Sequence, residues 1–204
     1  LSVYSSGGFR QLGNATKSIH VPGDMKGLKW RTTKSPVEFM LVKNWGATPT
    51  PYDWSQLYSG LQSGVVEGQY VASPWQHVAK LHEVAKYFTE IGGMWSGNIL
   101  AMDAKQYNAL SSQEKKWLHE AADAYGEKVN QLDNAWIKNG EDAIKASAKE
   151  WYVPTEAEMS KWRAGAIGAW LDAKGTFEPE VAKRVLLEQG MDGFVAQLEK
   201  AGAL

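Results

Sequence analysis

The 204-residue sequence contains no cysteine. This absence excludes disulfide bonds, Cys-ligated zinc, iron–sulfur clusters and thiol catalysis. The sequence also lacks any run approaching the ~18 consecutive apolar residues that a membrane-spanning helix needs. We therefore expect no direct insertion of the chain into a membrane.

An excess of charge of either sign is missing as well. Twenty-two Lys and Arg residues oppose 23 Asp and Glu residues, which gives a formal net charge of −1. Proteins that bind nucleic acid or an acidic membrane surface usually carry a marked basic excess. The composition therefore argues against both kinds of partner.

The common catalytic motifs are absent. The sequence has no G-x-S-x-G, no Walker loop and no G-x-G-x-x-G. His77 and His82 are five residues apart, which places them on different faces of a continuous helix. We predict no metal site, no cofactor and no enzymatic activity. An α/β enzyme that acts on a carboxylate substrate, with Glu67 or His82 as its base, is the alternative.

Short strand-like and helical patterns alternate over residues 1–110, which predicts an α/β arrangement of layers. We predict strands over 1–4, 28–32, 87–91 and 98–102, a strand stub at 65–66 and a loop over 47–53. Ser35-Pro36 and Ser73-Pro74 each combine an N-cap with proline at the first helical position, so both predict helix starts. The second of these helices is expected to run to residue 84.

Residues 111–204 have a helical pattern throughout. Ser111 with Glu114 and Thr155 with Glu158 form capping boxes that predict two helix starts. We expect the first of these helices to reach about residue 149 with a kink at Gly140, and two more helices to follow over 179–189 and 192–200. Four of the ten tryptophans lie on apolar helical stripes and are predicted to be core residues. They are Trp117, Trp136, Trp162 and Trp170.

Two arginines and one tryptophan stand beside turns of the first half. Arg10 follows the Gly7-Gly8 turn, and Arg31 ends a strand-like segment. An arginine binds a carboxylate with two parallel hydrogen bonds, a geometry that lysine cannot reproduce. Trp54 follows a proline-rich loop, where an aromatic ring can cover an organic ligand.

The order of several segments resembles the DctP-type solute-binding proteins of TRAP transporters. The matching segments are Gly8-Phe9-Arg10, the run V-P-G-D-M-K-G-L-K-W-R at 21–31, G-A-T-P-T-P at 46–51, S-Q-L-Y-S-G-L-Q-S-G-V-V-E-G-Q at 55–69 and E-V-A-K-Y at 83–87. They extend over some ninety residues in the family's order. The helical half is similar to the family in pattern alone.

The resemblance implies a type II periplasmic-binding-protein-like fold without enzymatic activity. We expect residues 1–110 to be the second α/β ligand-binding lobe with hinge-crossing strands, and residues 111–204 to be a helical segment that packs on and bridges the lobes. Most of an N-terminal lobe is expected to be missing, and a signal peptide to have been removed or truncated. The implied protein is periplasmic, captures a small organic acid and delivers it to the membrane permease.

The resemblance also implies roles for individual residues. Arg31 would hold the ligand carboxylate bidentately, Arg10 would be a second cationic contact, and Trp54 would pack against the ligand. Further candidates for ligand binding are Gln69, Tyr70 and Trp95, with Trp75 as a weaker one.

The sequence departs from the family pattern after Gly68-Gln69. The family's E-N-P is replaced by Tyr70-Val71-Ala72, so the asparagine that would bind the carboxylate has no counterpart. We therefore expect an apolar or aromatic monocarboxylate, or a zwitterion such as ectoine, rather than a plain dicarboxylate. A sensor partner or a structural module without a ligand is a further alternative.

Overall fold

A seven-stranded mixed β-sheet organises the chain, and the computed structural model describes residues 1–204. The strand order is β3-β2-β4-β1-β5-β7, and β6 pairs with β1. The strands are β1 (Ser2–Asn14), β2 (Lys29–Thr32), β3 (Thr48–Pro51), β4 (Gly68–Ala72), β5 (Tyr87–Thr89), β6 (Trp95–Leu100) and β7 (Glu150–Tyr152). The helices are α1 (Pro36–Asn44), α2 (Leu57–Ser63), α3 (Ser73–Val78), α4 (Ala104–Ala109), α5 (Ser112–Ser147), α6 (Glu156–Asp172), α7 (Pro179–Glu188) and α8 (Asp192–Ala201). The predicted α/β class is confirmed.

Strands β2, β3 and β4 run parallel to one another. The predicted loop at 47–53 is wrong because this region contains β3, and the predicted strand stub at 65–66 is wrong because β4 begins only at Gly68. Strand β3 carries two prolines, which cannot donate to a ladder and are tolerated at the edge position that it occupies. Strand β4 is buried along its whole length, so it lacks the alternation that reveals a half-exposed strand.

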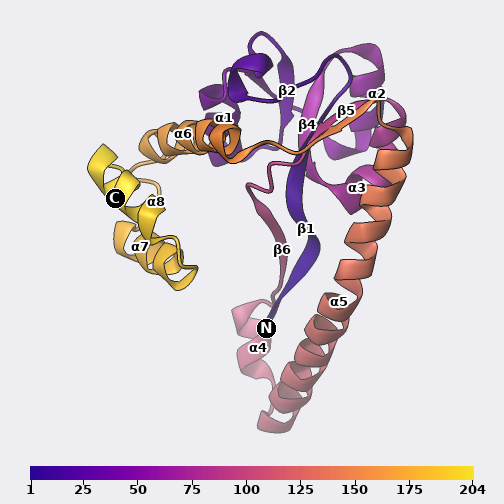
Figure 1. Cartoon of the computed structure of the whole chain (residues 1–204). Coiled ribbons are helices and arrows are strands. Elements are labelled where there is room, and N and C mark those ends of the chain that lie inside the picture. The colour runs from indigo at the N-terminus through magenta and orange to yellow at the C-terminus, as the bar shows by residue number, and fades with distance from the viewer.

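Strand β1 is longer than predicted, because Gly7 and Gly8 continue it. Both glycines have positive φ, 92° and 70°, and the pairing of β1 with β6 shifts its register between Ser5 and Gly8. Glycine adopts positive φ without steric cost, so this pair forms a bulge rather than a strand end. The first half of β1 and β6 therefore extend together away from the rest of the sheet (Figure 1).

Helix α5 runs beside this extension as one uninterrupted 36-residue helix, so the predicted kink at Gly140 is wrong (Figure 1). Gly140 instead allows α3 to approach, since a Cβ there would lie 2.6 Å from the Pro74 Cα. The predicted apolar face is also wrong, because Trp117 is 60% exposed. The buried face carries mostly small residues, which let β1 and α3 pack closely. Its members are Ala122, Gly126, Asp133, Gly140 and Ile144.

The predicted helix caps have different outcomes. The side chains of Ser35, Ser111 and Thr155 accept hydrogen bonds from the third residue of their helices, which confirms these three starts. The predicted N-cap at Ser73 is wrong, since the N-cap of α3 is Ala72 and Ser73 is already the first helical residue. Helix α3 also ends earlier than predicted, at Val78, and a short 3-10 turn follows at Leu81–Glu83.

The main core contains eleven buried residues and brings α1 and α6 against the sheet. Trp162 of α6 meets Trp45 edge to face at 5.2 Å, and the Trp45 Nε1 donates to the Trp162 carbonyl oxygen at 3.2 Å. Trp162 is therefore a core residue, as predicted. Trp170 is partly buried against a separate small core that α7 and α8 share with α6. None of the helices is both long and apolar enough to cross a membrane.

Candidate functional site

The candidate site lies at the edge of the sheet where the parallel strands end. Strands β2, β3 and β4 end at Thr32, Pro51 and Ala72, and Arg10 of antiparallel β1 pairs with Ala72. In open α/β sheets, ligands bind in the crevice outside the carboxyl ends of the strands. This edge therefore brings together Arg10 and Ala72, which are 62 positions apart in the sequence.

Arg31 is buried at this edge and has no ionic partner. The residue is 6% exposed and belongs to none of the ion pairs of the molecule. Its Nε donates to the Tyr52 carbonyl oxygen at 3.0 Å, which orients the guanidinium and leaves its terminal nitrogens without a protein acceptor. A buried charge without a counter-ion is costly, so this arrangement is suited to an anion from outside.

Burial lowers the pKa of Arg31, and neighbouring Arg10 lowers it further. The nearby carboxylates of Glu38 and Asp53 act in the opposite direction and raise the pKa of Arg31. Because an arginine side chain stays protonated in proteins, these effects do not remove its charge at neutral pH. They do place Arg10, Glu38 and Asp53 within electrostatic reach of Arg31.

A pocket of about 340 Å³ opens in front of Arg31. Most of its lining residues are polar or charged, and they come from the ends of β2 and β3 and from the segments that follow them. The lining residues are Arg31, Thr33, Lys34, Pro51, Tyr52, Asp53 and Trp54. Of the six predicted binding residues, the pocket therefore contains Arg31 and Trp54.

Aromatic rings continue the wall beside this pocket. The guanidinium carbon of Arg31 lies 5.9 Å from the centre of the Trp54 ring. Trp54 meets Trp75 edge to face at 6.5 Å, and Trp75 meets Trp136 of α5 at 5.1 Å. Trp75 is held in place because its Nε1 donates to the Ser6 carbonyl oxygen at 3.0 Å. The row offers an apolar surface next to a cation.

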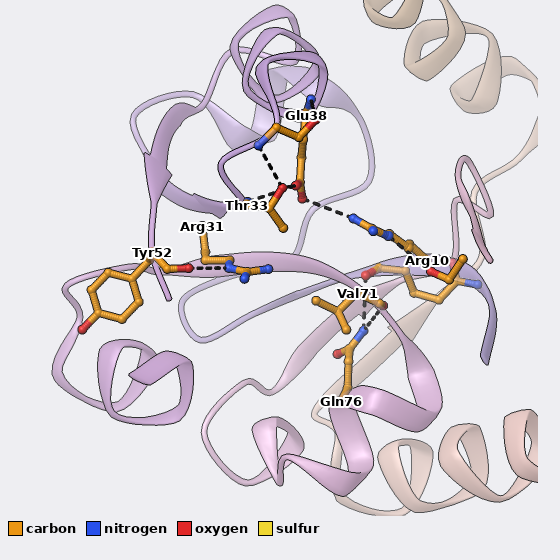
Figure 2. Close-up of polar contacts among 10 residues, drawn as sticks. Arg10, Arg31, Thr33, Glu38, Tyr52, Val71 and Gln76 are labelled. Carbon is orange, nitrogen blue, oxygen red and sulfur yellow. Dashed lines mark hydrogen bonds and ion pairs between the residues drawn. The ribbon is translucent and has the colours of Figure 1, made fainter. Parts of the chain in front are cut away.

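Arg10 approaches the same region from β1. Figure 2 shows the guanidinium groups of Arg10 and Arg31 pointing toward each other, with Glu38 above them. The Arg10 Nη1 lies 3.4 Å from the Glu38 Oε1, and its Nε donates to the Ser96 Oγ at 3.3 Å. Arg10 does not line the pocket itself, but Glu38 connects it to Thr33, which does.

The other three predicted binding residues do not line the pocket. Gln69 is fully buried, and its Nε2 donates to the Gln76 Oε1 at 2.6 Å. Tyr70 is fully buried against Trp45, and burial raises the pKa of its unpaired hydroxyl. Trp95 is exposed on β6, the strand that pairs with the first half of β1. Ligand contacts by these three residues stay predictions.

The alternative catalytic bases are also remote from the pocket. Glu67 accepts a hydrogen bond from the Lys29 backbone nitrogen at 2.9 Å, where β2 begins rather than ends. The His82 and His77 rings lie 5.1 Å apart. The expectation that they face different ways is wrong, because α3 ends at Val78 and the chain turns back at Lys80, whose φ is 57°.

Sequence reasoning missed Glu38 and Thr33 as parts of this site, and it named Trp75 as a weaker candidate only. Glu38 and Thr33 follow the Arg31 strand directly, so their closeness in sequence was an available signal. The position of Trp75 beside Trp54 depends on how β4 and α3 pack, and no local pattern reports that.

Comparisons with known sequences and structures all point to the same protein family. The model of the family described as DctP, bacterial extracellular solute-binding protein family 7, matches residues 1–174. A solute-binding protein of Verminephrobacter eiseniae is 32% identical over 130 residues, which are 63% of this chain and 38% of that protein. The ectoine-binding periplasmic protein TeaA of Halomonas elongata is 29% identical over 150 residues, which are 74% of this chain and 43% of TeaA.

Solved structures of TRAP periplasmic solute-binding proteins have a fold similar to that of this chain. The structure of the ectoine-binding protein of the TeaABC TRAP transporter has a TM-score of 0.78 at 25% identity and covers 98% of this chain. A TRAP periplasmic solute-binding protein of Shewanella oneidensis with bound succinate has a TM-score of 0.83 at 20% identity. This chain spans 63% and 62% of those two structures, so its fold is part of a TRAP periplasmic binding protein. Because the family model matches most of the sequence and the fold agrees, the chain belongs to the DctP family of bacterial extracellular solute-binding proteins.

Proposed function

We propose that this chain forms one wall of the ligand cleft in the periplasmic solute-binding component of a TRAP transporter. It binds a small organic carboxylate and delivers it to the membrane permease. The observation that carries the proposal is Arg31, a buried guanidinium in a polar pocket with no carboxylate partner of its own. The names of the relatives point in the same direction, since they bind ectoine or 2,3-diketo-L-gulonate.

In this proposal each group has a separate task. The two terminal nitrogens of Arg31 bind the carboxylate oxygens in parallel, a geometry that depends on the planar fork. Arg10 adds a second positive charge from the neighbouring strand. Trp54 and Trp75 cover the apolar part of the ligand and exclude water, which strengthens the ion pair.

The experiment is a calorimetric titration of the chain with succinamate, a monocarboxylate, and with succinate, the ligand of one structural relative. The titration extends to millimolar ligand because this chain spans 62% of that relative. Arg31→Ala is expected to weaken binding by about 3 kcal/mol or more, which is more than 100-fold. Arg31→Lys is expected to lose much of the same affinity, because a lysine has no planar fork.

The matched control is Arg163→Ala. This arginine is on α6, where it pairs with Glu156 on the exposed surface. The control loses the same side chain and charge and is expected to bind like the parent. If both Arg31 variants also bind like the parent, the assignment of Arg31 is wrong.

The alternative of an enzyme has less support, because Glu67 and His82 lie outside the pocket. A structural module without a ligand makes a different prediction. A ligand that binds the folded state alone raises the melting temperature, whereas a structural module would show no shift with any carboxylate.

A further inference from the structure

Glu38 is a buried acid in a site that otherwise suits an anion. The residue is 2% exposed and lies in the first turn of α1, directly after the Arg31 strand. Its Oε1 pairs with the Arg10 Nη1 at 3.4 Å. Its Oε2 accepts hydrogen bonds from the backbone nitrogen of Thr33 at 3.0 Å and from the Thr33 Oγ1. Figure 2 shows these contacts above the two guanidinium groups.

The position of Glu38 is set by several bonds. Its backbone nitrogen donates to the Ser35 Oγ at 3.4 Å, so the helix start and the carboxylate share one local structure. Both carboxylate oxygens have donors, which offsets the cost of burying a charged carboxylate. Glu38 is therefore a fixed negative charge at the inner end of the site.

The charges around the site can be counted directly. Arg10 and Arg31 contribute +2 and Glu38 contributes −1, which leaves +1. Among the residues that line the pocket, Lys34 and Asp53 carry opposite charges and cancel. This wall of the cleft therefore balances one carboxylate, and a second carboxylate would find Arg10 already paired with Glu38.

We propose that Glu38 is a specificity-determining residue, which holds Arg10 and makes this wall prefer a ligand with one carboxylate over a ligand with two. The inference rests on the proposed function, since it concerns the same site. It supplies a physical reason for the monocarboxylate that the sequence suggested. A purely structural role for Glu38, as an anchor of Thr33 and α1, would affect stability without affecting this preference.

The test uses two probes of equal size that differ by one charge. Succinate has two carboxylates, and succinamate has an amide in place of one of them. Dissociation constants for both are measured on the full chain by calorimetry, with the fluorescence of the tryptophans beside Arg31 as a second readout. The measured quantity is the ratio of the two dissociation constants.

Glu38→Gln raises the local charge from +1 to +2 while it keeps the size of the side chain. We expect the ratio of the two dissociation constants to change by roughly tenfold in favour of succinate binding. This is the effect expected of one unit charge acting at short range in a partly buried site. Glu156→Gln is the matched control. It removes the same charge from the exposed surface of α6 and is expected to leave the ratio unchanged.

The double variant Glu38→Gln, Arg10→Gln separates charge from structure. It returns the local charge to +1, so the ratio is expected to return to the parent value although both affinities fall. It also removes the arginine that Glu38→Gln leaves without a partner, so it provides a second folded sample if the single variant unfolds.

The outcomes distinguish the two proposals. If Glu38→Gln leaves the ratio of dissociation constants unchanged, or if the double variant keeps the shifted ratio, the specificity role of Glu38 is overturned. Neither result affects the proposed carboxylate site at Arg31. If the parent binds neither probe at millimolar concentration, the proposed function fails and this inference fails with it.

Discussion

Strand β1 passes through two different environments. Its second half, Gln11–Asn14, is buried between β4 and β5 and contributes Leu12 to the main core. Its first half pairs with β6, and Val3 there is 60% exposed. A two-stranded ribbon is marginally stable on its own. One strand therefore contains both a part of the core and a part that depends on its neighbours.

Helix α5 is the neighbour that supports the ribbon. The Asn130 Oδ1 and the Asp133 Oδ1 each accept a backbone N–H of β1, from Ser5 and Gly7, both at 2.9 Å. These bonds satisfy donors that no further strand reaches. The sheet part of β1 is therefore held by apolar burial, whereas the ribbon part is held by polar contacts and the close approach of a helix.

The largest expected difference between the two parts comes from a matched pair of truncations in β1. Leu12→Ala should lower the free energy of unfolding by about 2–5 kcal/mol, because it leaves a cavity in the core. Val3→Ala removes an exposed side chain and should change it by less than about 0.5 kcal/mol. Urea unfolding measures both. Equal losses would show that burial is not what distinguishes the halves.

A second matched pair of substitutions compares two glycines of α5, one packed against α3 and the other against the β1–β6 ribbon. A Cβ at Gly140 would lie 2.6 Å from the Pro74 Cα, and a backbone atom cannot rotate away. Gly140→Ala should therefore destabilise the protein by about 1–3 kcal/mol. A Cβ at Gly126 would meet the Ser2 Oγ at 2.5 Å, and that side chain can rotate.

Gly126→Ala should thus keep the helix-propensity gain of alanine, up to about 1 kcal/mol, and leave stability equal or higher. Both changes are made inside the same helix, so the intrinsic preference cancels in the comparison. Thermal unfolding at matched concentration checks it. A loss of stability at Gly126 as large as at Gly140 would contradict this account of the ribbon.

The smallest expected effect is on the pH dependence of the protein's stability. Burial lowers the pKa of His82 from its ordinary value near 6.5, and the nearby charges of His77 and Lys86 lower it further. The Gln76 backbone and Glu83 oppose this by raising the pKa of His82. The unfolded chain then binds a proton more readily than the folded chain just below pH 6.5, so acidification through this range should lower stability.

His82→Gln removes this titration and should flatten the dependence of stability on pH between about 7.5 and 5.5. The control is His119→Gln on the exposed part of α5, where the ring bonds the Tyr107 hydroxyl at 3.0 Å. Its pH profile should follow that of the parent. A profile of His82→Gln as steep as the parent's would mean that His82 does not contribute.

Much of the local structure could be predicted from the sequence. The capping residues Ser35, Ser111 and Thr155 mark helix starts because each interaction spans three residues. The position of Arg31 near the end of β2 could also be predicted, because a strand pattern likewise extends over a few neighbouring residues. The buried strand β4 could not be read, because burial on both faces removes the alternation.

The features of the candidate site fall into the same two groups, those that the sequence predicts and those that it does not. The sequence alone predicts the strand that carries Arg31, the turn that carries Trp54 and the family pattern that connects them. Only the folded chain shows that Glu38 meets Arg10, that Trp75 extends the wall beside Trp54, and that small residues rather than Trp117 form the inner face of α5. Capping and strand patterns act over a few residues. Contacts between β1, α1 and α3 depend on how distant segments close around one core, and no short stretch of sequence records that closure.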